Sequence, residues 1–123
     1  QIIPKQFKTT TILDKNETLS TIKLTSVLSG KLNDIKFKIN PEKQQIEITA
    51  QDSELGENQS VIEGKISGEP LEIVFNHNYL SDGINNLFGN KVFFGFNGPT
   101  NPVLLKSPEE TDYLYIVMPI KPF

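Results

Sequence analysis

Few side chains in this sequence are of the kind that carries out catalysis. The single histidine, His77, stands between two asparagines, and no nucleophile or carboxylate lies at a spacing that would pair with it. The carboxylates are scattered singly, apart from Glu109 and Glu110. Cysteine is absent, no zinc-ligand pattern occurs, and no glycines have the spacing of a phosphate loop. We therefore expect no catalytic residue, no metal site and no cofactor, which indicates that the protein is not an enzyme.

The carboxyl end offers a different chemistry, the binding of apolar side chains. Residues Tyr113–Phe123 read YLYIVMPIKPF, and apolar side chains fall on both faces of the part that precedes the first proline. Met118 suits varied partners because its thioether is flexible and polarisable, and Pro119 fixes the backbone before binding. This segment could form a docking surface. Alternatively, Met118 and Ile120 fill the bottom of the hydrophobic core.

The elements that must position this tail begin with a strand and a helix. FKTTTIL at Phe7–Leu13 is rich in β-branched residues and predicts a strand. Asp14 or Asn16 can cap a helix that runs until Gly30. Its apolar positions recur at helical spacing, at Leu19, Ile22, Val27 and Leu28. Three strands are predicted next, within NDIKFKIN (33–40), QQIEITA (44–50) and SVIEGKI (60–66).

The same order of elements recurs in the second half. LEIVF at Leu71–Phe75 predicts a strand, and Asn76 or Asn78 can cap a helix that closes at Gly89. The apolar residues predicted to face inward are Tyr79, Leu80, Ile84 and Leu87. Strands follow within KVFFGF (91–96), PVLLK (102–106) and DYLYIVM (112–118). Two strand-helix-three-strand units predict an α+β domain with antiparallel sheets and both helices on one face.

Composition limits the classes of partner. The 123 residues suit one domain, and the net charge is −3. All twelve cations are lysines, and the lack of arginine disfavours a domain that reads DNA bases. No stretch is long enough for a membrane span and no signal-peptide pattern is present, so we expect no membrane contact and a cytoplasmic location. Because the first residue is Gln1, we expect a piece of a longer chain.

Four stretches in order along nearly the whole chain resemble the C-terminal third domain of the bacterial sliding clamp, the β subunit of DNA polymerase III. They are QIIPK (Gln1–Lys5), IEITAQDSELGENQ (Ile46–Gln59), FNHNYLSDGI (Phe75–Ile84) and YIVMPI (Tyr115–Ile120). The resemblance implies the DNA-clamp domain fold. It also implies that residues 1–6 are the remnant of an interdomain linker and that residues 7–123 form the domain.

The resemblance implies a processivity factor of DNA replication. In this family a head-to-tail homodimer of three-domain subunits closes a ring around double-stranded DNA, independently of base sequence. The ring tethers the DNA polymerase III alpha subunit, the clamp loader and other proteins that carry a clamp-binding motif. The polar faces of the helices line its channel, with Lys15 and Lys23 as weak DNA-facing cations. Val27 and Leu28 are expected at the interface between subunits.

The resemblance also assigns a peptide-binding groove to the carboxyl end. Carried over residue by residue, the groove uses Ile2, Leu32, Asn76, Tyr79, Thr100, Pro102, Ile116, Val117, Met118, Pro119, Ile120 and Lys121. Its other wall belongs to the preceding domain. Lys121 replaces a common arginine, and the chain continues to Phe123, which could compete with the peptide. The alternative function is a stand-alone protein-interaction module that uses the same groove without encircling DNA, and Tyr79 has the alternative of a core position.

Overall fold

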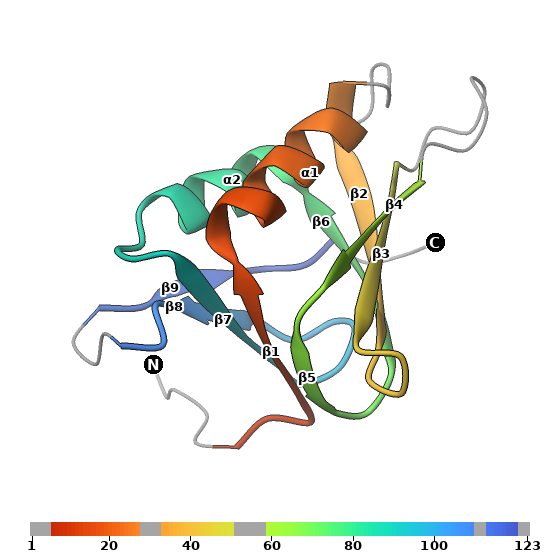
Figure 1. The fold of residues 1–123 in the computed structure, drawn as a ribbon, viewed down its shortest axis with the longest axis vertical. Helices are drawn as coiled ribbons and strands as arrows, with labels where there is room; N and C mark the ends of the chain where they lie inside the picture. Colours follow the sequence, from red (N-terminus) through yellow and green to blue (C-terminus); the bar gives the residue numbers. More distant parts are fainter. Residues whose placement is uncertain (1–5, 28–32, 51–58, 110–112, 121–123) are drawn as a thin grey trace.

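The computed structural model describes residues 6–27, 33–50, 59–109 and 113–120, and Figure 1 shows their arrangement. The elements follow the predicted order, with one additional short strand. Their bounds are β1 Thr9–Asp14, α1 Lys15–Val27, β2 Asp34–Asn40, β3 Gln45–Ala50, β4 Gln59–Glu63, β5 Lys65–Gly68, β6 Leu71–Asn76, α2 His77–Asn85, β7 Lys91–Phe96, β8 Val103–Lys106 and β9 Tyr115–Val117. None of the helices in the described part of the chain is long and apolar enough to cross a membrane.

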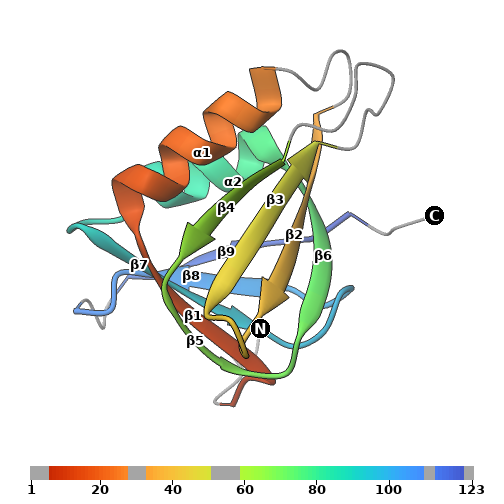
Figure 2. The same cartoon turned by 45° about the vertical axis from the view of Figure 1, so that its right-hand side comes forward.

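The strands form two antiparallel sheets. The five-stranded sheet has the order β5-β1-β7-β8-β9, and the four-stranded sheet has the order β4-β3-β2-β6. Helices α1 and α2 lie side by side and cover the same side of the sheets (Figures 1 and 2). The predicted α+β class, with two helices on one face of antiparallel sheets, is confirmed.

Alternating side chains place the core between the sheets and the helices. In β2, Ile35, Phe37 and Ile39 are buried, whereas Lys36 and Lys38 point outward. Phe37 packs edge to face on Phe75, with 5.4 Å between the ring centroids. Each such buried side chain contributes about 1.5 to 3 kcal/mol relative to an exposed one. The core therefore holds both sheets in one packed unit.

The single strand predicted at 60–66 is divided at Gly64, and this part of the prediction is wrong. β4 belongs to the four-stranded sheet, whereas β5 pairs with β1 in the other sheet. A methyl group at Gly64 would lie 2.7 Å from the Ile12 carbonyl oxygen, so the crossing requires glycine. The Gln44 side chain accepts from the Ile66 N–H at 2.9 Å and donates to the Ile66 carbonyl at 2.6 Å. It thereby fixes the β2–β3 turn against β5.

The tail makes a second crossing between the sheets. After β9, the Ile120 N–H donates to the Val74 carbonyl at 2.8 Å, which forms a bridge with β6. The chain thus passes from the five-stranded sheet to the four-stranded sheet through Met118 and Pro119. Figure 2 shows the tail running from β9 past β6. The β4 and β5 edges are therefore connected through Gly64, and the β9 and β6 edges are connected through the tail.

The helices begin at residues predicted as caps. Asp14 Oδ2 accepts from the Glu17 N–H at 2.9 Å at the start of α1. At the start of α2, Asn76 Oδ1 accepts from the N–H groups of Asn78 and Tyr79, at 2.9 and 3.3 Å. Asn76, rather than Asn78, is therefore the cap. Helix α2 ends at Asn85, earlier than predicted; Asn86 is its C-cap, and the next N–H group, of Leu87, donates to the Ile84 carbonyl at 3.1 Å.

The prediction that Tyr79 faces inward is wrong. Leu80, Ile84 and Leu87 are buried as expected, whereas Tyr79 is 67% exposed. Each helical residue is rotated by about 100° from the next, so Tyr79 lies at the side of the buried stripe that Leu80 begins. Its exposure leaves an aromatic ring at the surface near the start of α2.

Candidate functional site

The tail and the first turn of α2 come together at one corner of the domain. Strand β6 leads directly into α2, and Val74, which binds the Ile120 N–H, lies two residues before the cap Asn76. The tail therefore passes the point at which α2 begins. Tyr79 is held here because its own N–H donates to the Asn76 side chain. The bridge to Val74 fixes the tail, and the Asn76 cap fixes the first turn of α2.

Strand β8 supplies the other side of the corner. Val103 pairs with Val117, so Pro102 follows on toward Met118 when the antiparallel register continues by one residue. Pro102 and Thr100 are exposed in the segment that precedes β8. We use the name tail surface for the residues that β6, α2, the segment before β8 and the tail bring to this corner, which are Asn76, Tyr79, Pro102, Met118, Pro119 and Ile120.

The exposure of the tail residues bears on the alternative that Met118 and Ile120 fill the core. Met118 is 61% exposed, so it does not fill the core. Pro119 and Ile120 are half-buried, as is Ile116 on the outer face of β9. Val117 is only 4% exposed and belongs to the core, so its side chain is not available to a ligand. Ile2, Leu32 and Lys121, also predicted for the groove, lie outside the described residues.

The tail surface has the chemistry of an apolar docking site. None of its six residues is charged, and its polar side-chain groups are the Asn76 amide and the Tyr79 hydroxyl. Apolar walls with a few polar groups are typical of sites that take up hydrophobic side chains. Met118 and Tyr79 would supply the apolar area, because these are its most exposed large side chains.

Comparison with known proteins gives one consistent family. The model of the DNA polymerase III beta subunit, C-terminal domain, matches residues 1–121. The chain belongs to this family. The beta sliding clamp of Synechococcus elongatus is 30% identical over 98% of this chain and 32% of its own length. The beta sliding clamp of Bacillus subtilis is 28% identical over 99% of this chain and 33% of its own length.

Solved structures of sliding clamps share the fold. The Thermotoga maritima DNA polymerase III beta subunit matches with a TM-score of 0.91 and 27% identity, over 99% of this chain and 33% of that one. The Bacillus subtilis sliding clamp matches with a TM-score of 0.89 and 29% identity, over 98% and 32% of the respective chains. This sliding-clamp domain thus spans about a third of the length of its relatives.

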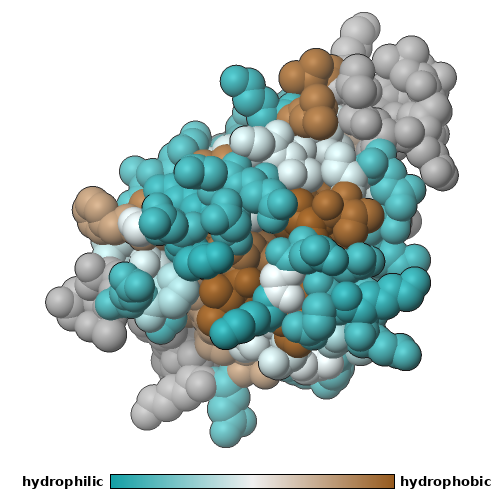
Figure 3. All heavy atoms as spheres, viewed as in Figure 1, coloured by the Kyte–Doolittle hydropathy of each residue, from teal (hydrophilic) through white to brown (hydrophobic). Residues whose placement is uncertain are grey.

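The cations predicted to face DNA differ in their surroundings within this clamp domain. Lys15 Nζ donates to the Leu87 carbonyl at 2.5 Å, just past the end of α2. It therefore ties the two helices together at this end. Lys23 is exposed on α1. Figure 3 shows hydrophilic residues along α1 and a hydrophobic group at its C-terminal end.

The hydrophobic group at the end of α1 includes one residue that the sequence predicted and one that it missed. Val27, predicted for the subunit interface, is 69% exposed, and Leu28 lies outside the described residues. Leu24 was not predicted there, although it is 61% exposed one turn earlier. The signal for Leu24 was its spacing of three residues from Val27, which places both on one side of a helix.

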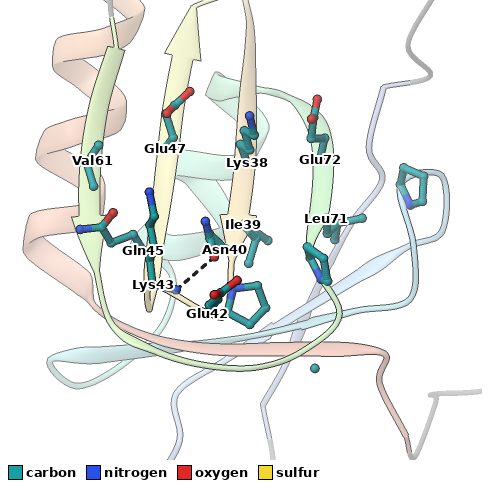
Figure 4. Close-up of a pocket in the computed structure, with 14 residues that line it drawn as sticks. Lys38, Ile39, Asn40, Glu42, Lys43, Gln45, Glu47, Val61, Leu71 and Glu72 are labelled. Atoms are coloured by element: carbon teal, nitrogen blue, oxygen red, sulfur yellow. Dashed lines mark hydrogen bonds between the residues drawn. The ribbon is translucent and has the colours of Figure 1, made fainter.

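A hollow of about 980 Å³ lies on the outer face of the four-stranded sheet, around the β2–β3 turn (Figure 4). Its wall includes a cross-strand row of Glu47, Lys38 and Glu72. Lys36 adds an exposed ion pair with Glu72, at 3.4 Å. The hollow adjoins the start of β6, whereas the tail surface adjoins its end. Since its charges alternate in sign, the hollow offers no clear preference for an anion or a cation.

His77 and the carboxylates form no recognisable chemical site among the described residues. His77 is half-buried as the first residue of α2, where its backbone N–H donates to the Asn33 carbonyl at 2.9 Å. No group of three histidine, aspartate or glutamate side chains that could hold a metal ion occurs in the described ranges.

Proposed function

We propose that this chain is part of a processivity clamp that encircles duplex DNA and tethers a polymerase and other partners through the tail surface. The observation that carries the proposal is the joint exposure of Tyr79 and Met118 in a domain of the sliding-clamp family. Monomeric proteins rarely leave a contiguous apolar patch without a use. The role is one of tethering and requires no catalytic residue.

The tail surface suits a short peptide because its two sides are held before binding. The Asn76 cap fixes the first turn of α2, and the bridge to Val74 fixes Ile120. Pro119 further restricts the backbone between them. A preformed site loses little conformational freedom when its ligand arrives, so more of the contact energy appears as affinity. Apolar side chains such as leucine and phenylalanine are the expected anchors.

Sheet edges support the proposed ring. Strand β4 ends the four-stranded sheet and β9 ends the five-stranded sheet, and on its outer side neither pairs in a ladder with another of the described strands. Open edges invite pairing with another chain or domain. The exposed Leu24 and Val27 lie on α1, which packs against β4. We propose that this corner meets a neighbouring subunit and that the β9 edge adjoins the preceding domain.

Encirclement explains why the domain needs no strong DNA contact. A ring retains the duplex by topology, and a tight grip on phosphates would hinder sliding because each contact must exchange with counterions. Exposed polar residues of α1 and α2, with Lys23 among them, suit a weakly interacting channel wall. A net charge of −3 is compatible with this function.

The proposal is tested by titrating the protein with a peptide of the type Gln-Leu-x-Leu-Phe. Binding should shift the NMR signals of Tyr79, Met118 and Ile120. Replacing Tyr79→Ala or Met118→Ala should weaken binding by about 1 to 3 kcal/mol, because each removes a side chain that the bound peptide would cover. The matched control is Phe88→Ala, which removes another aromatic residue, 70% exposed and beyond the opposite end of α2.

Two outcomes would contradict the proposal. Signal shifts elsewhere, with none at the tail surface, would remove the assignment of the site. So would equal losses of affinity in Phe88→Ala and Met118→Ala, because a specific surface distinguishes the two positions.

A further inference from the structure

Helix α2 has a glycine in its interior. Gly83 lies in the helix His77–Asn85, and it is buried. Glycine is among the least favourable residues inside a helix because it gives up the most backbone freedom. A glycine at this position therefore calls for a packing reason, and the neighbouring strand supplies one.

The space beside Gly83 is occupied by an aromatic ring. A methyl group at Gly83 would lie 2.8 Å from Tyr115 Cδ1 and 2.9 Å from Tyr115 Cε1. It would also lie 3.1 Å from Leu105 Cδ1. These separations are shorter than van der Waals contact between carbons, which is about 3.5 to 4.0 Å. The Tyr115 ring thus lies directly against the backbone of α2, where any larger residue would displace it.

This contact joins the two elements that carry the main apolar residues of the tail surface. Tyr115 is the first residue of β9, and Met118 follows β9 directly. Tyr79 lies four residues before Gly83, about one turn earlier in α2. Strand β9 has only three residues, and among the described strands it pairs with β8 alone. The packing of Tyr115 on α2 is therefore a main restraint on the distance between helix and strand.

We propose that Gly83 is a positioning residue, which sets the spacing between Tyr79 and Met118 by admitting the Tyr115 ring against α2. This inference rests on the proposed function, since it concerns the peptide that binds the tail surface. Gly83 itself touches no ligand. It acts because the smallest side chain on α2 faces the largest side chain on β9, so the two elements come close together.

The test replaces Gly83→Ala in the whole chain. The melting temperature should fall, although alanine ordinarily favours a helix, because the methyl group meets the ring. Affinity for the Gln-Leu-x-Leu-Phe peptide should fall by about tenfold, the size of loss expected when an anchor is misplaced. The chain has a single methionine, so the methyl signal of Met118 reports the position of the tail without overlap, and it should shift.

Matched variants distinguish an effect on the spacing between Tyr79 and Met118 from an effect on the stability of the whole domain. Asn85→Ala, on the exposed side of α2, should leave affinity and the Met118 signal unchanged. Tyr115→Phe keeps the ring and should bind like the parent chain. Tyr115→Leu removes the ring and should weaken binding even if Gly83→Ala fails to fold. In the double variant, Tyr115→Leu gives the alanine methyl room, so affinity should recover relative to Gly83→Ala alone.

Two failures are distinguishable. If the peptide binds neither the parent chain nor a protein that also carries the preceding domain, the proposed function fails, and the Met118 signal alone still decides whether Gly83 controls the spacing. If the parent chain binds but Gly83→Ala and Tyr115→Leu bind equally well with an unshifted Met118 signal, the positioning role is overturned.

Discussion

At the scale of single residues, two buried threonines of β1 differ in how their hydroxyl groups are satisfied. Thr9 Oγ1 donates to the Glu69 carbonyl at 2.7 Å. Thr11 Oγ1 is buried and has no hydrogen-bond partner among the described residues. A buried hydroxyl without a partner has lost its hydrogen bonds to water, and no hydrogen bond within the protein compensates for that loss. The Thr11 hydroxyl consequently lowers the stability of the folded protein.

We predict that Thr11→Val stabilises the protein by about 1 kcal/mol, because it removes the unsatisfied hydroxyl and keeps the shape of the side chain. Thr9→Val, on the same strand and face, should destabilise it by about 1 kcal/mol, because a hydrogen bond is lost. Urea unfolding of both variants measures the difference. Equal effects of the same sign would mean that the Thr11 hydroxyl has a partner.

The helix caps were largely predictable, and of the four residues of α2 and its end that were predicted to face inward, Tyr79 alone is exposed. Short polar side chains before an apolar run narrowed each cap to two candidates, because capping is a local interaction, and the structure selects Asp14 and Asn76. Leu80 lies four residues before Ile84, the spacing that places two side chains on one face of a helix, whereas Tyr79 lies five residues before it. Helical spacing therefore favours Leu80 over Tyr79 for the core, and the prediction that both face inward was too broad.

At the scale of elements, the segment before β1 is attached to the outer face of the five-stranded sheet. Phe7 packs edge to face on Phe93, with 5.9 Å between ring centroids. A methyl group at Gly95 would lie 2.5 Å from Phe7 Cε1, so the ring rests on the backbone of β7. The Lys8 N–H also donates to Asn97 Oδ1, at 3.0 Å. The absence of a side chain at Gly95 thus leaves room for the Phe7 ring to pack on β7.

We predict that Gly95→Ala releases the Phe7 segment and accelerates tryptic cleavage after Lys8. The methyl group takes the place of the ring, and Lys8 then becomes more accessible to the protease. Phe7→Ala should accelerate cleavage to a similar degree, since the same contact is lost.

The double variant provides the control for this contact. If Phe7 and Gly95 act through one interaction, combining the substitutions should add little to either single effect. Fully additive rates would contradict the contact, as would an unchanged cleavage rate in Gly95→Ala.

The order of elements was predictable because each helix and strand has its own periodicity and its own cap. The two crossings between sheets were not. Gly64 divides a strand because of its contacts with Ile12 and Leu13, about fifty residues earlier in the chain. Ile120 ends on β6 because it pairs with Val74. Such contacts leave no local pattern, so an uninterrupted strand was the simplest interpretation of residues 60–66.

At the scale of the whole molecule, the two halves exchange their first strands. β1 lies between β5 and β7, in the sheet built mainly by the second half, and β6 pairs with β2 of the first half. Each half therefore completes the sheet of the other. The tail surface has the same composite origin, since it combines residues from β6, α2, the segment before β8 and the tail. Only the resemblance to a known family could group these residues in advance.

We predict that Val27→Glu abolishes dimers in a protein that joins this domain to the other two thirds found in its relatives. An exposed valine tolerates the charge in the isolated domain, whereas an apolar subunit contact does not, because it would bury an unpaired carboxylate. Analytical sedimentation measures the change. Lys23→Glu on the same helix is the control and should remain dimeric, and dimers that persist in Val27→Glu would contradict the proposed interface.

The exchange of first strands has a consequence for synthesis on the ribosome. β1 emerges early, but β7, its neighbour over its whole length, is made roughly eighty residues later, and the bridge from Ile120 later still. Until then one edge of β1, a strand with three threonines and one isoleucine, stays unpaired in the nascent chain and can associate with other chains. Overexpression at low temperature, or with a chaperone that binds emerging polypeptides, should therefore raise the soluble yield.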